Sequence, residues 1–171
     1  MDERKDFMFS RKDLQRLIIP LIVEQFLSIT IGMADTVMVS VCGEAAVSGV
    51  SLVDAINILM INIFSALATG GAIVSSQYIG REDLGKACEA AKQLVLAVFV
   101  LSTAIGAIFV FGGPQVLGLL YHDIEADVMA SAESYFFLTA LSYPFIALYN
   151  AGAALFRAMG NSKVSMTISI V

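Results

Sequence analysis

The chain has 171 residues, of which 58% are hydrophobic and only 15% are charged, and its mean hydropathy is +0.82. This composition lies outside the range of soluble globular domains and indicates an integral membrane protein whose main partner is the lipid bilayer. The formal net charge of −5 implies no nucleic-acid-binding surface.

Long apolar runs follow a polar N-terminal segment. Residues 1–16 alternate basic, acidic and apolar side chains and are predicted to form a cytoplasmic amphipathic segment. A helix needs about 20 apolar residues to cross the hydrocarbon core of a bilayer. The predicted transmembrane helices are residues 17–41, 50–79, 94–111 and 135–156, and a fifth helix starts near Val164. Residues 17–171 are therefore expected to form an all-α membrane bundle of four complete helices and the start of a fifth.

The first and last of these runs need separate interpretation. The first is too long for a removable signal peptide, and it contains Glu24, Gln25 and Asp35. The last run, from Val164 to Val171, is too short to cross a membrane. We therefore expect the chain to be a fragment of a longer protein.

Glycine and proline mark three positions inside or beside the runs. Gly70 and Gly71 predict a kink or a close packing point in the second helix. Gly112, Gly113 and Pro114 are expected to end the third helix. Pro144 is expected to bend the fourth helix, because it frees a backbone carbonyl.

The basic residues predict the orientation of the chain. All ten fall before the first helix, between the second and third, or after the fourth: Arg4, Lys5, Arg11, Lys12, Arg16, Arg81, Lys86, Lys92, Arg157 and Lys163. In the other two connections, all the charged side chains are acidic. By the positive-inside rule, the N-terminus is cytoplasmic and the protein is a multi-pass protein of the cell membrane.

Two acidic residues on the first helix are the leading candidates for a cation-coupling site. Ionisable side chains inside a membrane are costly, and they are kept mainly where they face a bundle interior or a wet cavity. Glu24 and Asp35 are eleven positions apart, which at about 100° per residue places them on nearly the same helix face, with Ser28 between them. A carboxylate there can bind a proton or a sodium ion and release it when the cavity changes shape. The alternative is a structural hydrogen bond to a neighbouring helix.

The second helix supplies further candidates for a substrate cavity. Asp54 and Asn57 share a face one turn apart near its outer end. Met60, with other methionines, offers a soft wall suited to varied drug-like molecules. Ordinary core packing or lipid contact is the alternative for each methionine, and Asp54 can instead reach interfacial water.

The sequence does not predict an enzyme. His122 is the only histidine and lies in an outer loop, so neither a Ser-His pair nor a His-rich metal site can be assembled. Cys42 and Cys88 fall at opposite ends of the second helix and are predicted to be unpaired. No metal and no cofactor are expected, apart from a proton or sodium as the coupling ion.

Several motifs resemble one transporter family. Residues 20–25 (PLIVEQ) and 34–39 (ADTVMV) resemble the first helix of the multidrug and toxic compound extrusion (MATE) family. Residues 69–72 (TGGA) with 76–81 (SQYIGR) resemble its second helix and the following turn, and residues 156–163 (FRAMGNSK) resemble the turn after its fourth helix. The resemblance covers nearly the whole chain.

This resemblance implies part of a six-helix lobe, the N-terminal part of the first lobe in a twelve-helix transporter. Such a transporter would exchange a proton or sodium ion for structurally diverse, often cationic, drugs or toxic compounds by alternating access. Asp35 matches the family's first-helix aspartate, which is implicated in cation coupling, and Glu24, Gln25, Ser28, Asp54, Asn57 and Met60 complete the candidate set. The partners of the chain would be drug-like molecules and the missing helices of both lobes. The fragment alone is expected to be inactive. The alternatives are a lipid-linked oligosaccharide flippase of the same superfamily and a non-transporting helical assembly module.

Overall fold

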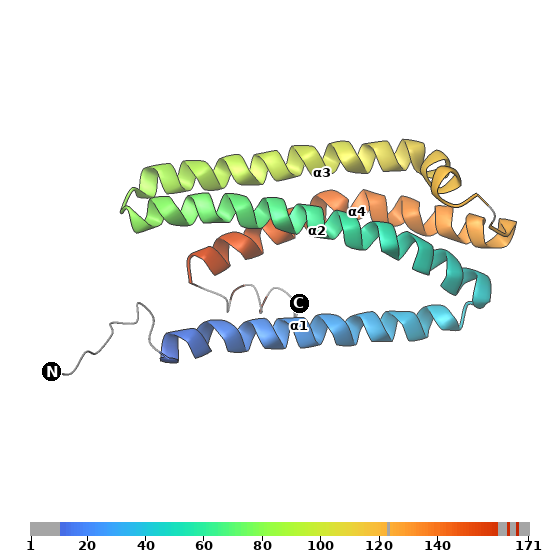
Figure 1. Cartoon of the computed structure of the whole chain (residues 1–171), viewed down its shortest axis with the longest axis horizontal. Coiled ribbons are helices and arrows are strands. Elements are labelled where there is room, and N and C mark those ends of the chain that lie inside the picture. Colours follow the sequence, from blue (N-terminus) through green and yellow to red (C-terminus); the bar gives the residue numbers. More distant parts are fainter. Residues whose placement is uncertain (1–10, 123, 161–163, 165–166, 168–171) are drawn as a thin grey trace.

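Four long helices make up the described part of the chain, which comprises residues 11–122, 124–160, 164 and 167 of a computed structural model. They are α1 (Arg11–Ser40), α2 (Glu44–Gly80), α3 (Leu84–Leu120) and α4 (Ala126–Ala158) (Figure 1). Each is long and apolar enough to cross a membrane. The prediction of an all-α bundle with four membrane-spanning helices is confirmed. Apart from Val164 and Thr167, which are helical, the expected fifth helix lies outside the described residues, as do residues 1–10 of the expected N-terminal segment.

The helices extend beyond the apolar runs that predicted them. Residues 50–79 and 94–111 were expected to be helical, whereas α2 and α3 have 37 residues each. The fourth helix likewise begins at Ala126 rather than near residue 135. An apolar run marks the part that can lie in hydrocarbon, but helical hydrogen bonding continues into polar residues at both ends.

The expectation that Gly112, Gly113 and Pro114 end the third helix is wrong. The helix α3 continues through Pro114 to Leu120, and Figure 1 shows its last turns directed away from the main helix axis. A proline removes one backbone hydrogen bond and bends a helix without necessarily ending it. Pro144 lies inside α4 in the same way, and the second half of α4, orange to red in Figure 1, runs towards α1.

Short turns make successive helices antiparallel neighbours. The α1–α2 turn contains Gly43 with a φ of 104°, a backbone conformation that favours glycine. Between α2 and α3, Asp83 caps α3 by accepting a hydrogen bond from the backbone N–H of Lys86 at 3.1 Å. The Nζ of Lys86 also lies 3.1 Å from Oδ2 of Asp83.

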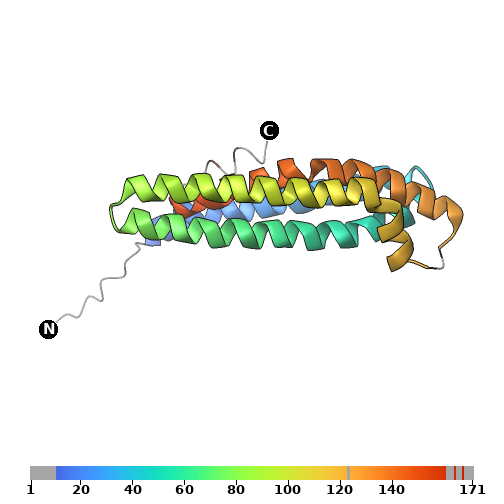
Figure 2. The ribbon, with the colours of Figure 1, turned by 90° about the horizontal axis from the view of Figure 1, so that it is seen from above.

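The core lies among α2, α3 and α4, which pack side by side in both ribbon views (Figures 1 and 2). Its two clusters are built around Tyr143 and Phe64 and around Phe136 and Leu117. The helix α1 contributes much less to this core, because large apolar side chains such as Ile22, Phe26 and Met38 are exposed. Within the described chain, α1 is thus a loosely attached fourth element.

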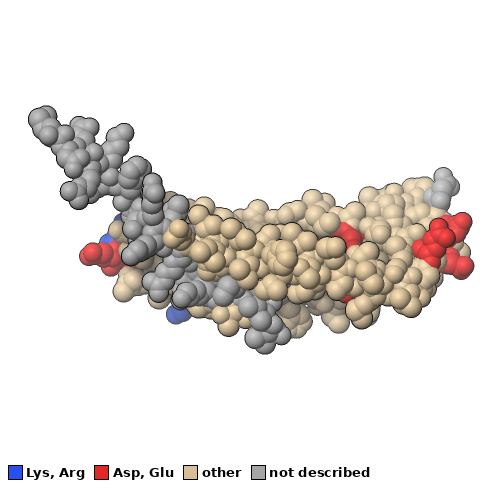
Figure 3. All heavy atoms as spheres, turned by 90° about the horizontal axis from the view of Figure 1, so that it is seen from below, with Lys and Arg blue, Asp and Glu red and all other residues tan. Residues whose placement is uncertain are grey.

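The basic side chains of the described residues lie at one end of the bundle. The α2–α3 turn, the start of α1 and the end of α4 lie at one end, and the other two connections lie at the opposite end (Figure 1). Figure 3 shows blue basic side chains at one end only, whereas red acidic side chains gather at the opposite end and also lie beside the basic ones and at the middle of the bundle. This is the distribution that the sequence pattern requires of four crossings.

Candidate functional site

A hydrogen-bonded polar network connects α2 to α4 inside the apolar bundle. The hydroxyl of Tyr143 donates to Oδ1 of Asn57 at 2.8 Å. Nδ2 of Asn57 in turn lies 3.5 Å from Oδ1 of Asp54, which also accepts a hydrogen bond from the hydroxyl of Tyr135 at 3.2 Å. Tyr143 and Asn57 are only 1% and 8% exposed. The predicted pair Asp54 and Asn57 is therefore held in a fixed arrangement by two tyrosines of α4.

A cavity of about 470 Å³ lies between α1, α2 and α4. Glu24, Gln25 and Ser28 line it from α1, so three of the predicted residues share one site. Its other walls come from α1, α2 and α4: Leu27, Ile31, Ile61, Ser65, Ile146, Tyr149, Asn150 and Arg157. The lining thus combines one acidic and one basic side chain with neutral polar and aliphatic groups, which suits an organic molecule carrying both charge and apolar surface.

The cavity has a polar end and an apolar end. Oε1 of Glu24 accepts a hydrogen bond from the hydroxyl of Tyr149 at 3.1 Å. Arg157, in the last turn of α4, donates its Nε to the backbone oxygen of Ala153 at 3.2 Å. Ile31 and Ile146 line the part of the cavity that is further from the basic end of the bundle. An amphiphilic ligand would therefore place its polar group towards the basic end of the bundle.

Asp35 lies outside this cavity but on the same side of α1. It is exposed. Glu24, by contrast, accepts a hydrogen bond from the hydroxyl of Tyr149 of α4. Both acidic residues lie in the single helix α1, at a spacing that puts them on nearly the same face.

Met60 has a different environment from the other candidates. Its side chain is half-buried and packs against both core clusters. It does not line the cavity between α1, α2 and α4. The position of Met60 indicates a packing role in this part of the chain.

Sequence reasoning missed the contribution of α4. Tyr135, Tyr143 and Tyr149 supply hydroxyl donors to Asp54, Asn57 and Glu24. The sequence did indicate a tyrosine face on this helix, because Tyr135 and Tyr149 are two heptads apart and therefore lie on the same side. Their partners could not be found from spacing, since they lie on other helices.

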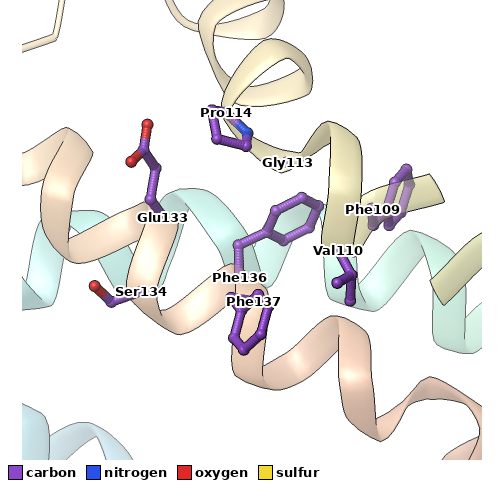
Figure 4. A pocket seen from close by; sticks show the side chains of 8 residues that line it. All are labelled: Phe109, Val110, Gly113, Pro114, Glu133, Ser134, Phe136 and Phe137. Atoms are coloured by element: carbon purple, nitrogen blue, oxygen red, sulfur yellow. The ribbon is translucent and has the colours of Figure 1, made fainter. Parts of the chain in front are cut away.

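A second pocket, of about 460 Å³, lies between α3 and α4 near the bend of α3 (Figure 4). Phe136 fills its inner wall and packs against Phe109 with ring centroids 5.2 Å apart. The carboxylate of Glu133 points away from the rings of Phe136 and Phe137 in Figure 4. Because its polar and aromatic groups do not converge, this pocket is a weaker candidate site.

Metal binding finds no support in the described residues. Across residues 11–122, 124–160, 164 and 167, no three His, Cys, Asp or Glu side chains come together in a group that could hold a metal ion.

Comparison with known proteins gives a consistent family. The family model MatE matches residues 20–171. An uncharacterized transporter of Bacillus subtilis, YisQ, is 29% identical over 152 residues, which is 88% of this chain and 33% of that protein. The fold is similar to that of a MOP superfamily transporter from Pyrococcus furiosus, with a TM-score of 0.86 and 19% identity over 93% of this chain and 35% of that one. The chain spans about a third of the length of both proteins, and it belongs to the MatE family of membrane transporters.

Proposed function

We propose that this chain forms part of a cation-coupled exporter that exchanges a proton or sodium ion for drug-like, often cationic, molecules by alternating access. The observation that carries the proposal is the acidic wall that α1 gives to the cavity, where Glu24 accepts a hydrogen bond from Tyr149 of α4. Asp35 lies eleven residues further along the same helix. The N-terminus is proposed to be cytoplasmic, which places the end of the bundle with Arg81 and Arg157 in the cytoplasm.

The loose attachment of α1 supports a coupling role for its acids. A carboxylate surrounded by apolar atoms holds a proton more tightly than one in water, and a hydroxyl donor favours the charged form. Movement of α1 relative to α4 would change both conditions at Glu24 and Asp35. Cation binding and helix position would then depend on each other.

The driving force is sufficient for export. Each cation that enters gains about 2.3 kcal/mol per 100 mV of membrane potential. That free energy sustains a concentration ratio of about fifty-fold for an exported molecule. One coupling carboxylate per transport cycle is therefore enough in principle.

The cavity between α1, α2 and α4 supports an organic substrate taken up from the cytoplasm. It lies towards the end of the bundle that carries Arg157, with Glu24 as its acidic group and isoleucines at its deeper end. Its volume of about 470 Å³ is within the range of small-molecule sites. In the proposed exporter, the rest of the transporter would complete this cavity.

A lipid-linked oligosaccharide flippase is the second candidate within transport. Such a substrate carries phosphate groups and would favour a cationic cavity, whereas this one contains Glu24 and a single basic side chain, Arg157. A non-transporting helical assembly module is the candidate from a different class. It would not need the Glu24–Tyr149 hydrogen bond inside a cavity.

Drug resistance in a susceptible bacterial strain tests the proposal. Cells that express the protein as part of its intact transporter should survive higher concentrations of cationic dyes, and Asp35→Asn should abolish this protection. Asp127→Asn is the matched control, because Asp127 is exposed in the first turn of α4, away from the cavity. Full resistance with Asp35→Asn at equal expression would remove Asp35 from the coupling role. No resistance with any variant would favour the flippase or the assembly module.

A further inference from the structure

A groove of about 520 Å³ lies between α3 and α4, separate from the cavity that contains Glu24. It is lined from α3 by Ala91, Lys92, Val95, Leu96 and Phe99 and from α4 by Leu148 and Leu155. At about 100° per residue, Leu148 and Leu155 fall on the face of α4 opposite Asn150 and Arg157, which line the cavity. The groove is therefore on the side of α4 that faces away from the candidate transport site.

Lys92 is the only charged residue of this apolar groove. Its side chain is exposed, and no ion pair of Lys92 occurs in the described part of the chain. Lys86, earlier on α3, is instead paired with Asp83 at 3.1 Å. Lys92 thus offers a positive charge at the end of an apolar channel, and the exposed Glu89, one turn earlier on α3, forms no ion pair with it among the described residues.

The depth of Lys92 matches the lipid headgroup region. The apolar run of α3 begins at Leu94, so Lys92 stands at the edge of the hydrocarbon core. Val95 and Phe99 then continue the groove by about 10 Å into that core, at a rise of about 1.5 Å per residue. The order of a cation followed by an apolar channel is complementary to a lipid phosphate followed by an acyl chain.

We propose that this groove binds one anionic phospholipid of the leaflet at the basic end of the bundle, with its phosphate on Lys92 and an acyl chain along Val95, Leu96 and Phe99. A zwitterionic lipid fits the apolar part equally well but brings its own positive charge close to Lys92. The groove therefore selects the anionic headgroup. This proposal does not depend on the export activity.

Fluorescence quenching by brominated lipids tests the proposal, because the sequence contains no tryptophan. Phe99→Trp places a single reporter in the groove, and Phe111→Trp, 84% exposed near the other end of α3, is the control. Each variant is reconstituted in phosphatidylcholine vesicles that contain either brominated phosphatidylglycerol or brominated phosphatidylcholine. The ratio of the two quenching constants gives the preference for the anionic lipid at each reporter.

We expect quenching of the Phe99→Trp reporter to favour brominated phosphatidylglycerol by about fivefold, which corresponds to the attraction of about 1 kcal/mol for one basic side chain at an anionic surface. In the Phe99→Trp background, Lys92→Gln should bring the ratio close to one, whereas Lys86→Gln should leave it unchanged. The Phe111→Trp reporter should show no preference. If Lys92→Gln and Lys86→Gln changed the ratio equally, the preference would come from general attraction between a basic surface and anionic lipid. That result would overturn the proposal. No quenching of Phe99→Trp by either lipid would overturn it as well, because a protein segment would then cover the groove.

Discussion

Tyr143 lies in the middle of α4, and its hydroxyl donates to Oδ1 of Asn57 at 2.8 Å inside the bundle. Tyr143→Phe would leave this oxygen of Asn57 without that donor in an apolar environment, which costs about 1 to 3 kcal/mol of unfolding free energy. Chemical unfolding of the purified protein in detergent micelles measures the difference. Ser142→Ala is the neighbouring control, because Ser142 is exposed and bonds only to its own helix, at Leu138. An equal, small effect of both substitutions would show that the network contributes no more than a surface hydroxyl.

Asp83 acts at the turn between α2 and α3, outside the membrane-spanning segments. The backbone N–H and then the ammonium of Lys86 hold the pKa of Asp83 below its ordinary value of 3.8. A carboxyl with a lowered folded-state pKa stabilises the fold above its unfolded pKa, and this contribution is lost as the pH falls through the folded pKa. Asp83→Asn keeps a capping oxygen but cannot titrate. The thermal midpoint of the wild type should therefore exceed that of Asp83→Asn at pH 6 and approach it below about pH 4. A constant difference across this range would contradict the assignment.

At the scale of the helices, two glycines set how closely the elements approach. A Cβ added to Gly49 of α2 would lie 2.9 Å from the backbone N of Ala132 and O of Val128, and one added to Gly106 of α3 would lie 2.9 Å from the O of Ala140. These are backbone atoms of α4, so the helices themselves would have to separate. Gly49→Ala and Gly106→Ala should each cost about 1 to 3 kcal/mol in the same unfolding assay.

Gly70→Ala is the matched control for these substitutions. No atom lies within 4 Å of a Cβ at Gly70, and alanine is the better helix former by about 1 kcal/mol. This variant should be neutral or more stable than the wild type. A loss of stability with Gly70→Ala as large as with Gly106→Ala would contradict the packing assignment, because Gly70 has no neighbouring helix to clash with and alanine favours the helix.

The same glycines show which features of the helices the sequence could predict. The apolar runs and their polar ends identified four membrane-spanning helices, since the thickness of the bilayer fixes the length of such a run. Gly70 and Gly71 were expected to kink or pack closely, and Gly71 does lie against the side chain of Leu94. Gly49 and Gly106 were not singled out, because their importance comes from a neighbouring helix that spacing alone does not place. The helix ends were also missed, since hydrophobicity measures burial in lipid and not hydrogen bonding.

At the scale of the whole molecule, the sequence predicted the acidic face of α1 but not what it faces. Glu24 and Asp35 were grouped by helical periodicity, and that grouping depends on one helix only. The hydrogen bond from Tyr149 to Glu24 depends on the packing of α4 beside α1, which no periodicity encodes. Only the wall of the cavity that α1 supplies was therefore predicted. The remaining walls follow from the antiparallel order of the helices.

The orientation of the bundle can be tested with the two native cysteines. Cys42 lies in the α1–α2 turn and Cys88 in the first turns of α3, and both are free and exposed at opposite ends of the bundle. If the N-terminus is cytoplasmic, a membrane-impermeant maleimide added to intact cells should label Cys42 and not Cys88, and permeabilised cells should show labelling of both. Cys42→Ser and Cys88→Ser assign each signal to its residue. Labelling of Cys88 alone in intact cells would reverse the orientation, and it would then place Lys92 and the opening of the Glu24 cavity on the outer side of the membrane.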